Sequence, residues 1–292
     1  MTKSYGAFKA NGSISIHVNH GEIYGFIGLN GAGKTTLIRI LLNMISPDSG
    51  EVYLFGKKLS NGFNLWNDIG YLVETPYSYP NLSVFDNLKL IHYLRRLKDL
   101  NSIDQIIEKL KLSKYRDIKA KNLSLGNKQR LGLAKAFMHQ PKLLILDEPI
   151  NGLDPEGIVE VRQLFKELAN NGTTIFISSH ILGEISKMAH RLAIIHEGKL
   201  VKELTSQQLN QEVERKLIID TSENENALKV LNSNGFKVNI NAEQQIECRD
   251  INTINKPESL SRFLVEQGFP PRQLFQYTED LEMYFLRMIK SK

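Results

Sequence analysis

Hydrophobic and polar residues alternate along residues 11–18, and an unbroken hydrophobic run follows over residues 23–27. The alternation puts Ile14, Ile16 and Val18 on one face, and a turn at residues 21–22 leads into the second run, so the pattern predicts a pair of strands. An apolar helix is expected over residues 37–44, and residues 51–58 have the pattern of a hairpin. The first part of the chain is therefore expected to hold antiparallel strands around one helix.

Helical spacing dominates from residue 81 to about residue 120. Ser83 is placed to cap a helix, and large aliphatic residues recur every three or four positions over residues 84–97 and 103–110. We interpret residues 81–120 as a helical insert in a larger domain. A polar start at Asn122 leads into a further helical pattern that continues to Met138.

Short hydrophobic runs alternate with helical segments between residues 143 and 195. Residues 143–146 are all apolar, as expected for a parallel strand that is buried on both faces. Helical patterns over residues 159–168 and 182–189 alternate with strand patterns over residues 173–178 and 192–195. This alternation predicts a doubly wound α/β core.

The pattern changes near residue 205. Residues 205–215 are polar and poorly patterned, so we expect a linker there, after a nucleotide-binding domain that spans residues 1–204. Strands are then expected over residues 216–219, 236–240 and 245–248, and helices over residues 226–231, 260–267 and 281–289. Residues 216–292 are therefore predicted to form a small α+β accessory domain, whose last helix packs an apolar face containing Leu281 and Phe285 into the core.

Composition narrows the class of protein only slightly. The chain is 41% hydrophobic and 24% charged, as in ordinary globular proteins. Its net charge of +5 suits an anionic nucleotide, a nucleic acid or an anionic membrane surface and does not choose among them. Cys248 is the only cysteine of the sequence, which excludes an internal disulfide framework and fits a reducing cytosol. We find no run of 18 apolar residues, so we expect any membrane role to depend on a partner.

The strongest chemical signal lies between the strand expected over residues 23–27 and the helix that follows it. Its sequence has the spacing of a phosphate-binding loop: Gly28-Leu29-Asn30-Gly31-Ala32-Gly33-Lys34-Thr35-Thr36. Glycines let backbone amides converge on a polyphosphate, and the following helix directs its positive N-terminal end toward it. We therefore expect residues 30–36 to hold a nucleoside triphosphate, with Lys34 at the β- and γ-phosphates and the Thr35 hydroxyl on Mg²⁺.

Two acidic residues, Asp147 and Glu148, follow the apolar run over residues 143–146, and Pro149 stops the strand after them. An acidic residue beside the phosphate loop can hold magnesium through water, and a second carboxylate can activate an attacking water molecule. We expect Asp147 to act on the metal and Glu148 to act as the general base.

Further motifs make residues 1–204 similar to the ATP-binding subunits of ABC transporters. The Leu-Ser-Gly-Gly-Gln signature of that family has a counterpart in Leu123-Ser124-Leu125-Gly126-Asn127. The aspartate loop of the family resembles Gly152-Leu153-Asp154-Pro155, its switch histidine matches His180, and its adenine-stacking aromatic residue matches Tyr5. The resemblance implies a P-loop NTPase core of ABC type, with an antiparallel β subdomain and a helical insert.

The resemblance also implies a head-to-tail homodimer that encloses two ATP molecules. Ser124, Gly126 and the start of the following helix would form a second anion site, for the γ-phosphate of the ATP that the other subunit holds. Asp154 would face the dimer, His180 would contact the γ-phosphate, and Tyr5 would stack on adenine. Hydrolysis would remove the bridging phosphate and release the pair.

Three residues depart from the family pattern. Leu125 replaces a glycine, and Asn127 replaces a glutamine, which would weaken or slow closure of the dimer. Glu74 stands where the family has a glutamine that touches both magnesium and the membrane partner, and a carboxylate can still bind a hard cation there. The Glu-Thr-Pro sequence at this position, together with the altered signature, resembles the bacterial subgroup that serves bacitracin and lantibiotic resistance or immunity.

These observations favour an ATPase that powers export of a peptide antibiotic or another amphipathic compound. It would lie in the cytoplasm on the inner face of the membrane and dock under separate transmembrane permease subunits through residues 74–79 and 81–120, with no direct contact to nucleic acid. The alternative is an ABC-type ATPase that acts on ribosomes or nucleic acid, but such proteins usually carry two ATP modules, and this chain has one phosphate loop. A non-catalytic regulatory subunit is the third possibility, and Glu148 argues against it.

Overall fold

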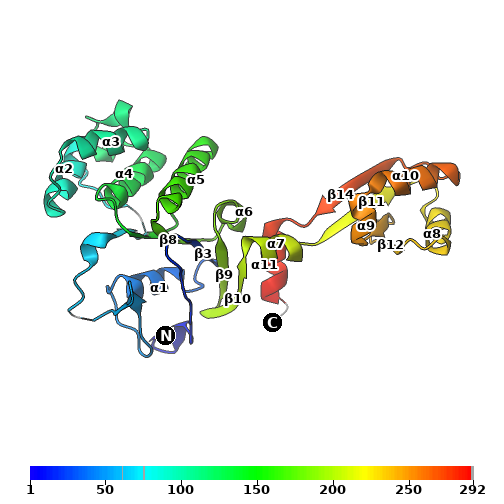
Figure 1. Cartoon of the computed structure of the whole chain (residues 1–292), viewed down its shortest axis with the longest axis horizontal. Coiled ribbons are helices and arrows are strands. Elements are labelled where there is room, and N and C mark those ends of the chain that lie inside the picture. Colours follow the sequence, from blue (N-terminus) through cyan, green and yellow to red (C-terminus); the bar gives the residue numbers. More distant parts are fainter. Residues whose placement is uncertain (61, 75, 291–292) are drawn as a thin grey trace. The chain divides into compact units, whose positions relative to one another are not determined.

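The computed structural model describes residues 1–60, 62–74 and 76–290 (Figure 1). The chain divides into two compact units, Met1–Gln207 and Gln208–Lys292, and each has a hydrophobic core of its own. The division falls within the linker expected over residues 205–215. That segment is not an irregular linker, because helix α7 (Ser206–Glu212) occupies most of it and buries Leu209.

A largely parallel sheet forms the centre of the first unit. Its strand order is β10-β9-β3-β8-β7-β6, and only the β9–β10 pair in this sheet is antiparallel within the described residues. The strands are β3 (Ile23–Ile27), β6 (Ile69–Leu72), β7 (Leu143–Asp147), β8 (Thr174–Ser179), β9 (Arg191–His196) and β10 (Lys199–Thr205). Every residue of β3, β7 and β8 is buried, so the expected α/β core is confirmed.

Helices cover both faces of this sheet. In Figure 1, α1 (Lys34–Leu41) lies on one side, and α4 (Leu125–Phe137) and α5 (Pro155–Asn170) lie on the other. Tyr24 and Phe26 pack on Phe176, with ring centroids 5.8 and 5.6 Å away, and α1 covers them with Leu37 and Ile38. Because β3, β7 and β8 run parallel, their carboxyl ends meet at one edge, and the loops that follow them converge there.

Residues 81–120 are helical, as the periodicity predicts. They contain α2 (Val84–Leu94), α3 (Asn101–Lys109) and the 3₁₀ turns η2 (Ser113–Tyr115) and η3 (Ala120–Asn122). The Ser83 hydroxyl caps α2 by accepting a hydrogen bond from the Asp86 amide at 3.0 Å. Local periodicity and a capping serine are therefore sufficient to specify this region.

Antiparallel hairpins flank the sheet, although one expected strand is absent. The hairpins pair β1 (Lys3–Tyr5) with β2 (Phe8–Asn11) and β4 (Tyr53–Leu54) with β5 (Lys57–Lys58). Residues 12–22, all described, lie outside any strand, so the pair predicted over residues 11–27 is wrong in its first half. Ile14 is buried while the residues on each side of it are exposed or half-buried, as the alternation required. However, its backbone exchanges hydrogen bonds with Met1 alone and does not join a ladder.

The second unit is an antiparallel sheet with strand order β12-β13-β11-β14, packed against helices. Its elements are β11 (Arg215–Asp220), α8 (Asn224–Ser233), β12 (Val238–Ile240), β13 (Ile246–Cys248), α9 (Ile251–Asn255), α10 (Pro257–Glu266), β14 (Gln273–Thr278) and α11 (Leu281–Lys290). Strand β14 and helix α9 were not expected. β14 was missed because it is an edge strand that is almost wholly exposed and so shows no burial alternation. Cys248 is buried in the core of this unit.

Candidate active site

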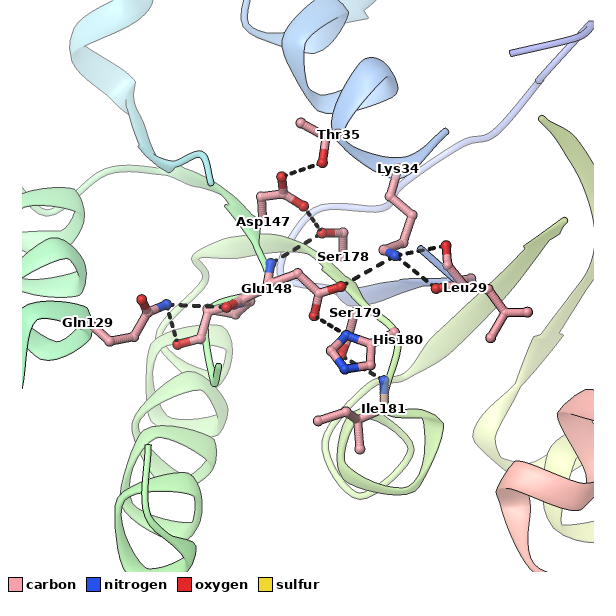
Figure 2. Close-up of polar contacts among 12 residues, drawn as sticks. Leu29, Lys34, Thr35, Gln129, Asp147, Glu148, Ser178, Ser179, His180 and Ile181 are labelled. Carbon is pink, nitrogen blue, oxygen red and sulfur yellow. Dashed lines mark hydrogen bonds and ion pairs between the residues drawn. The ribbon is translucent and has the colours of Figure 1, made fainter. Parts of the chain in front are cut away.

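The loop between β3 and α1 is built so that only glycine fits at its tightest point. Gly33 has a φ of 102°, and a Cβ atom there would lie 2.1 Å from the carbonyl oxygen of Ala10. The side chain of Lys34, the first residue of α1, turns back over the loop. Its Nζ donates hydrogen bonds to the carbonyl oxygens of Gly28 at 2.8 Å and Leu29 at 3.2 Å (Figure 2). A buried cation is thus held over the loop, and binding of phosphate by the backbone amides of residues 30–36 stays a prediction.

Asp147 ends β7 next to the start of α1. It is 2% exposed, and its Oδ2 accepts a hydrogen bond from Thr35 Oγ1 at 2.7 Å. Its other carboxylate oxygen accepts a hydrogen bond from the Ser178 hydroxyl on β8. The structure therefore brings together two of the three residues that the sequence assigns to the metal, Thr35 and Asp147, which are 112 positions apart in the chain, and Ser178 orients the carboxylate.

Glu148 lies between two groups that can carry positive charge. Its Oε1 is 3.3 Å from Lys34 Nζ, and its Oε2 is 3.0 Å from His180 Nδ1, which follows β8 (Figure 2). The backbone of Glu148 has a φ of 48°, a left-handed conformation that is rare for a residue with a side chain. Its amide donates a hydrogen bond to the Ser178 carbonyl oxygen at 3.1 Å, which helps to hold this conformation.

Gln129 and Ser178 are functional candidates that the sequence interpretation did not single out. Gln129 is 4% exposed on α4, and its amide nitrogen donates hydrogen bonds to the carbonyl oxygens of Glu148 at 3.2 Å and Pro149 at 2.9 Å. The sequence does contain a sign of its role: Gln129 lies four and eight positions before Leu133 and Phe137, so this polar residue shares the buried face of α4 with them. Gln129 ties the helix after the signature to the backbone of the candidate base.

The signature segment and the aspartate loop lie against each other. Ser124 caps α4 by accepting a hydrogen bond from the Asn127 amide at 3.3 Å, and Asp154 caps α5 by accepting one from the Gly157 amide at 3.0 Å. The Leu125 side chain packs on Gly152, where an added Cβ would lie 2.6 Å from Leu125 Cγ. Ser124, Leu125 and Asp154 are exposed, so this pair of loops is open to a partner.

A Cβ atom on Gly126 would lie 2.9 Å from the carbonyl oxygen of Gly152. This position in the signature therefore accepts no larger residue without movement of the aspartate loop. The sequence expectation that Gly126 lets backbone approach an anion stays a prediction.

Glu74 has a different neighbour from the one expected. It follows β6, and its carboxylate forms an ion pair with Arg39 of α1, with 54% of its side chain exposed. The structure thus places Glu74 with Arg39, and its assignment to magnesium stays a prediction.

Tyr5 lies in the β1–β2 hairpin, 48% exposed, with Lys3 Nζ 5.7 Å from its ring centroid. Its register partner Phe8 is 60% exposed, so the hairpin offers a second aromatic ring that the sequence interpretation passed over. Asn11, at the other end of β2, donates a hydrogen bond to the Gly33 carbonyl oxygen at 3.1 Å. The hairpin is thereby attached to the phosphate loop, and adenine stacking on Tyr5 stays a prediction.

Comparison with known proteins identifies the family. The profile of the ABC transporter family matches residues 12–151. The bacitracin transport ATP-binding protein BcrA of Bacillus licheniformis is 38% identical over 291 residues, which cover 99% of this chain and 95% of BcrA. The lantibiotic transport ATP-binding protein SrtF of Streptococcus pyogenes is 39% identical over 203 residues, 70% of this chain and 87% of SrtF.

A solved structure of an ATP-binding subunit of an ABC transporter superposes with a TM-score of 0.66 and 27% identity. The match covers 72% of this chain and 89% of that protein, which confirms the expected ABC ATPase fold. The chain therefore belongs to the family of ABC transporter ATP-binding proteins, which bind and hydrolyse ATP.

Proposed function

We propose that this chain hydrolyses ATP to power the export of a peptide antibiotic, or a similar amphipathic compound, through separate membrane subunits. The observation that carries the proposal is the 38% identity to a bacitracin transport ATP-binding protein, which extends over both units of the chain. The lantibiotic transport relative supports the same class of cargo. The near full-length match favours this function over an ATPase that acts on ribosomes or nucleic acid.

The site residues fit the chemistry of phosphoryl transfer to water. Lys34 would bind the β- and γ-phosphates together with the backbone amides of residues 30–36, and His180 would contact the γ-phosphate. Glu148 would polarise the attacking water, because its carboxylate reaches both Lys34 and His180. Bound to this loop, ATP would separate Lys34 from Glu148 and free the carboxylate to accept a proton.

The residues also fit a magnesium ion. Thr35 and Asp147 present a hydroxyl and a carboxylate within 2.7 Å of each other, and Mg²⁺ prefers such hard oxygen ligands. Phosphate oxygens and water would complete its coordination, and Glu74 could join them only by leaving Arg39. Magnesium would neutralise charge that develops on the phosphates.

The active unit would be a homodimer. Ser124 and Asp154 are exposed at the starts of α4 and α5, and Gly126 lies half-buried in the first turn of α4. Helix N-termini favour anions, so this surface would complete the ATP site of a second copy. Tyr5 would hold adenine on the side of the phosphate loop.

A membrane partner is required by this function. Within the described residues, every helix is too short or too polar to cross a bilayer. We place the docking site of the partner at the groove that α2 of the helical insert lines together with Pro76, Tyr77 and Tyr79, and the chain itself at the inner face of the membrane.

The experiment that tests the function is loss of resistance. A strain that lacks this chain should become at least several-fold more sensitive to a bacitracin-type or lantibiotic peptide, as measured by minimal inhibitory concentrations over a panel of both classes. The wild-type chain should restore resistance, while Glu148→Gln, which keeps the fold and loses the base, should not. Unchanged sensitivity to every peptide of the panel would refute export of this class of compound.

A further inference from the structure

Within the described residues, strand β14 leaves one edge of the sheet of the second unit unpaired. In the strand order β12-β13-β11-β14, it pairs with β11 over all six of its residues and without a bulge. Five of these residues are exposed, and Leu274 is half-buried. None of residues 273–278 is charged or proline, although natural edge strands commonly use such residues to avoid pairing with other chains. This edge can therefore receive a further strand.

The opposite edge of the same sheet is protected. Strand β12 has three residues, and Lys237 comes directly before it. The turn after β12 is closed by a hydrogen bond from the Gln245 amide to Asn241 Oδ1 at 2.8 Å. Short strands and lysine both disfavour pairing at an edge. Of the two edges, β14 is the one with the length and composition of a pairing strand.

The aromatic side chains of β14 lie on the face of the sheet that the helices leave open. Helices α8, α9 and α10 pack on the face that contains Leu217 of β11. Phe275 and Tyr277 lie on the opposite face and are 46% and 37% exposed. Lys216 Nζ is 5.0 Å from the centroid of the Tyr277 ring and 2.6 Å from a carboxylate oxygen of Glu247. Because Glu247 balances this lysine, a second aromatic strand could approach without meeting an uncompensated charge there.

The contacts between β14 and β11 show which backbone groups of β14 face outward. The Glu279 amide donates a hydrogen bond to the Glu214 carbonyl oxygen at 2.7 Å, one register step beyond the strand. Residues that face the neighbouring strand alternate along an antiparallel ladder, so Phe275 and Tyr277 direct their N–H and C=O groups toward β11. The alternate residues direct theirs toward the outer edge: Leu274, Gln276 and Thr278.

We propose that β14 pairs with β14 of a second copy of this chain, antiparallel and around a two-fold axis at Gln276, so that the two sheets become one. This axis places Gln276 opposite itself and Leu274 opposite Thr278 of the second copy, so the outward backbone groups of all three residues are paired. Phe275 then lies opposite Tyr277 of the second copy, with Cα atoms about 4.5 Å apart. Cross-strand aromatic pairs of this kind stabilise a sheet.

Charges beyond the two ends of β14 favour a second copy as the partner. Arg272 directly precedes the strand, Asp280 follows it by two residues, and both are exposed. In the register centred on Gln276, Arg272 of each copy lies opposite Asp280 of the other, so the two-fold axis creates an opposite-charge pair at both ends. An axis at Phe275 would instead place Arg272 opposite the neutral Thr278. Arg272 has no ion pair among the described residues, so it is free for this contact.

The direct test is disulfide trapping of the full chain, with and without Mg-ATP. Differently tagged Phe275→Cys and Tyr277→Cys chains are mixed and mildly oxidised, while the buried Cys248 is kept. Directly opposed residues are close enough for a disulfide, whereas two copies of residue 275 lie on a diagonal about 7 to 8 Å apart. The mixed disulfide should therefore form at least tenfold faster than the 275–275 disulfide. Val265→Cys, 56% exposed on α10, measures random collision.

Two results of this experiment would overturn the inference. One is a mixed disulfide that forms no faster than the disulfide of Val265→Cys, both with and without Mg-ATP. The other is a 275–275 disulfide that forms faster than the mixed one, because the register centred on Gln276 would then be wrong.

A second measurement isolates the charges at the ends of the strand. Arg272→Glu in both cysteine chains, or Asp280→Lys in both, places like charges opposite each other and should slow trapping about tenfold. Arg272→Glu in one chain and Asp280→Lys in the other restores opposite charges at both ends and should restore the rate, which local damage to the fold would not do. Arg262→Glu, an exposed change on α10, is the matched control and should leave the rate unchanged. A rate that stays low in the complementary mixture would contradict the pairing.

A third comparison separates the backbone of Gln276 from its side chain. Gln276→Pro removes the outward amide and should slow trapping about tenfold; the fold should tolerate it, because this amide does not face β11. Gln276→Ala loses the hydrogen bond from Nε2 to the Ile254 carbonyl oxygen, 2.6 Å long, and should be trapped at the parent rate. An equal loss in both variants would refute the central backbone pair. Equal melting temperatures verify folding, and the cysteine and charge comparisons decide alone if the proline variant unfolds.

The inference goes beyond the proposed function, because it uses no residue of the ATP site, and the two fail separately. If Tyr277→Cys in native membranes forms a disulfide with another protein and none with Phe275→Cys, the second copy is refuted as the partner of β14, and the resistance assay is unaffected. If the mixed disulfide forms but resistance does not depend on the chain, the proposed function fails and the strand pairing stands.

Discussion

Replacing Glu148 with glutamine should tighten ATP binding and strongly slow turnover. In the structure, Glu148 Oε1 lies 3.3 Å from Lys34 Nζ, and the side chains are only 18% and 6% exposed. If Lys34 binds the γ-phosphate as proposed, the carboxylate would compete with it for the same ammonium group and would also repel the phosphate. Glutamine has nearly the same shape and removes both effects, so the change isolates the charge.

The size of the effect follows from the distance. Two unit charges 3.3 Å apart attract each other by about 5 kcal/mol at an effective dielectric constant of 20. Desolvation and the remaining hydrogen bonds offset part of this energy. If about 1.4 to 3 kcal/mol of it opposes ATP, the dissociation constant of Glu148→Gln should be about ten to a hundred times lower than that of the wild type. Loss of the general base should reduce kcat by about 10²- to 10⁴-fold.

Two assays separate these effects. Calorimetric titration with ATP gives the affinity, and phosphate release at saturating Mg-ATP gives kcat. Light scattering after size exclusion should also show Glu148→Gln as a dimer that persists in Mg-ATP, because the bridging phosphate is not removed. Glu108→Gln, an exposed change on α3, is the control for loss of one negative charge.

The reasoning would be refuted by an ATP affinity that stays the same or falls, since the ion pair would then not compete with nucleotide. A variant that remains monomeric in saturating Mg-ATP would refute the composite site. Retained hydrolysis would remove Glu148 from the role of base.

Three further predictions concern the phosphate loop, the signature and the half-buried His139. Lys34→Ala should weaken ATP binding at least a hundredfold, because two loop carbonyl oxygens and the phosphates lose their cation; unchanged affinity by calorimetry would contradict the phosphate-loop assignment. Leu125→Gly should lower by several-fold the ATP concentration needed for dimers in light scattering, because it removes an exposed side chain that packs on Gly152, and an unchanged midpoint would mean that this side chain does not hinder closure. Burial lowers the pKa of His139 to about 4, so the unfolded chain binds more protons between pH 6.5 and 4 and the folded state should lose stability as the pH falls through this window. His139→Gln should flatten the dependence of the melting temperature on pH in this range, and an equally steep curve would show that other groups cause it.

The parts of this protein that sequence predicts well are those whose physical cause is local. The phosphate loop requires glycines at fixed spacing and a strand and helix on each side of it, and all of these lie within one short segment. The approach of Thr35 to Asp147 was also predictable, because a motif fixes each residue and parallel strands bring their ends together. The α2–α3 insert follows from its periodicity.

Other features depend on contacts that sequence does not display. The alternation over residues 11–18 puts Ile14, Ile16 and Val18 on one face, and of these Ile14 is buried and the other two are half-buried. A strand also needs a neighbouring backbone in register, and that neighbour is set by the fold. Glu74 meets Arg39, and Gln129 meets the backbone of Glu148, through packing of distant elements. Polar residues over 205–215 suggest a linker because the one buried leucine of α7, Leu209, is too weak a signal for a helix.

The hydrogen bonds from Gln129 to the carbonyl oxygens of Glu148 and Pro149 bear on when each subunit of the dimer would hydrolyse its ATP. Helix α4 begins within the signature, which would touch the nucleotide of the other subunit. Gln129, on the same helix, binds the backbone of Glu148, the candidate base for the nucleotide of its own subunit. If α4 shifts when the ATP of the other subunit binds to the signature, the Glu148 carboxylate would therefore move as well. Two such bridges in a symmetric dimer would couple the two ATP sites, so that neither subunit would hydrolyse ATP before both sites are occupied.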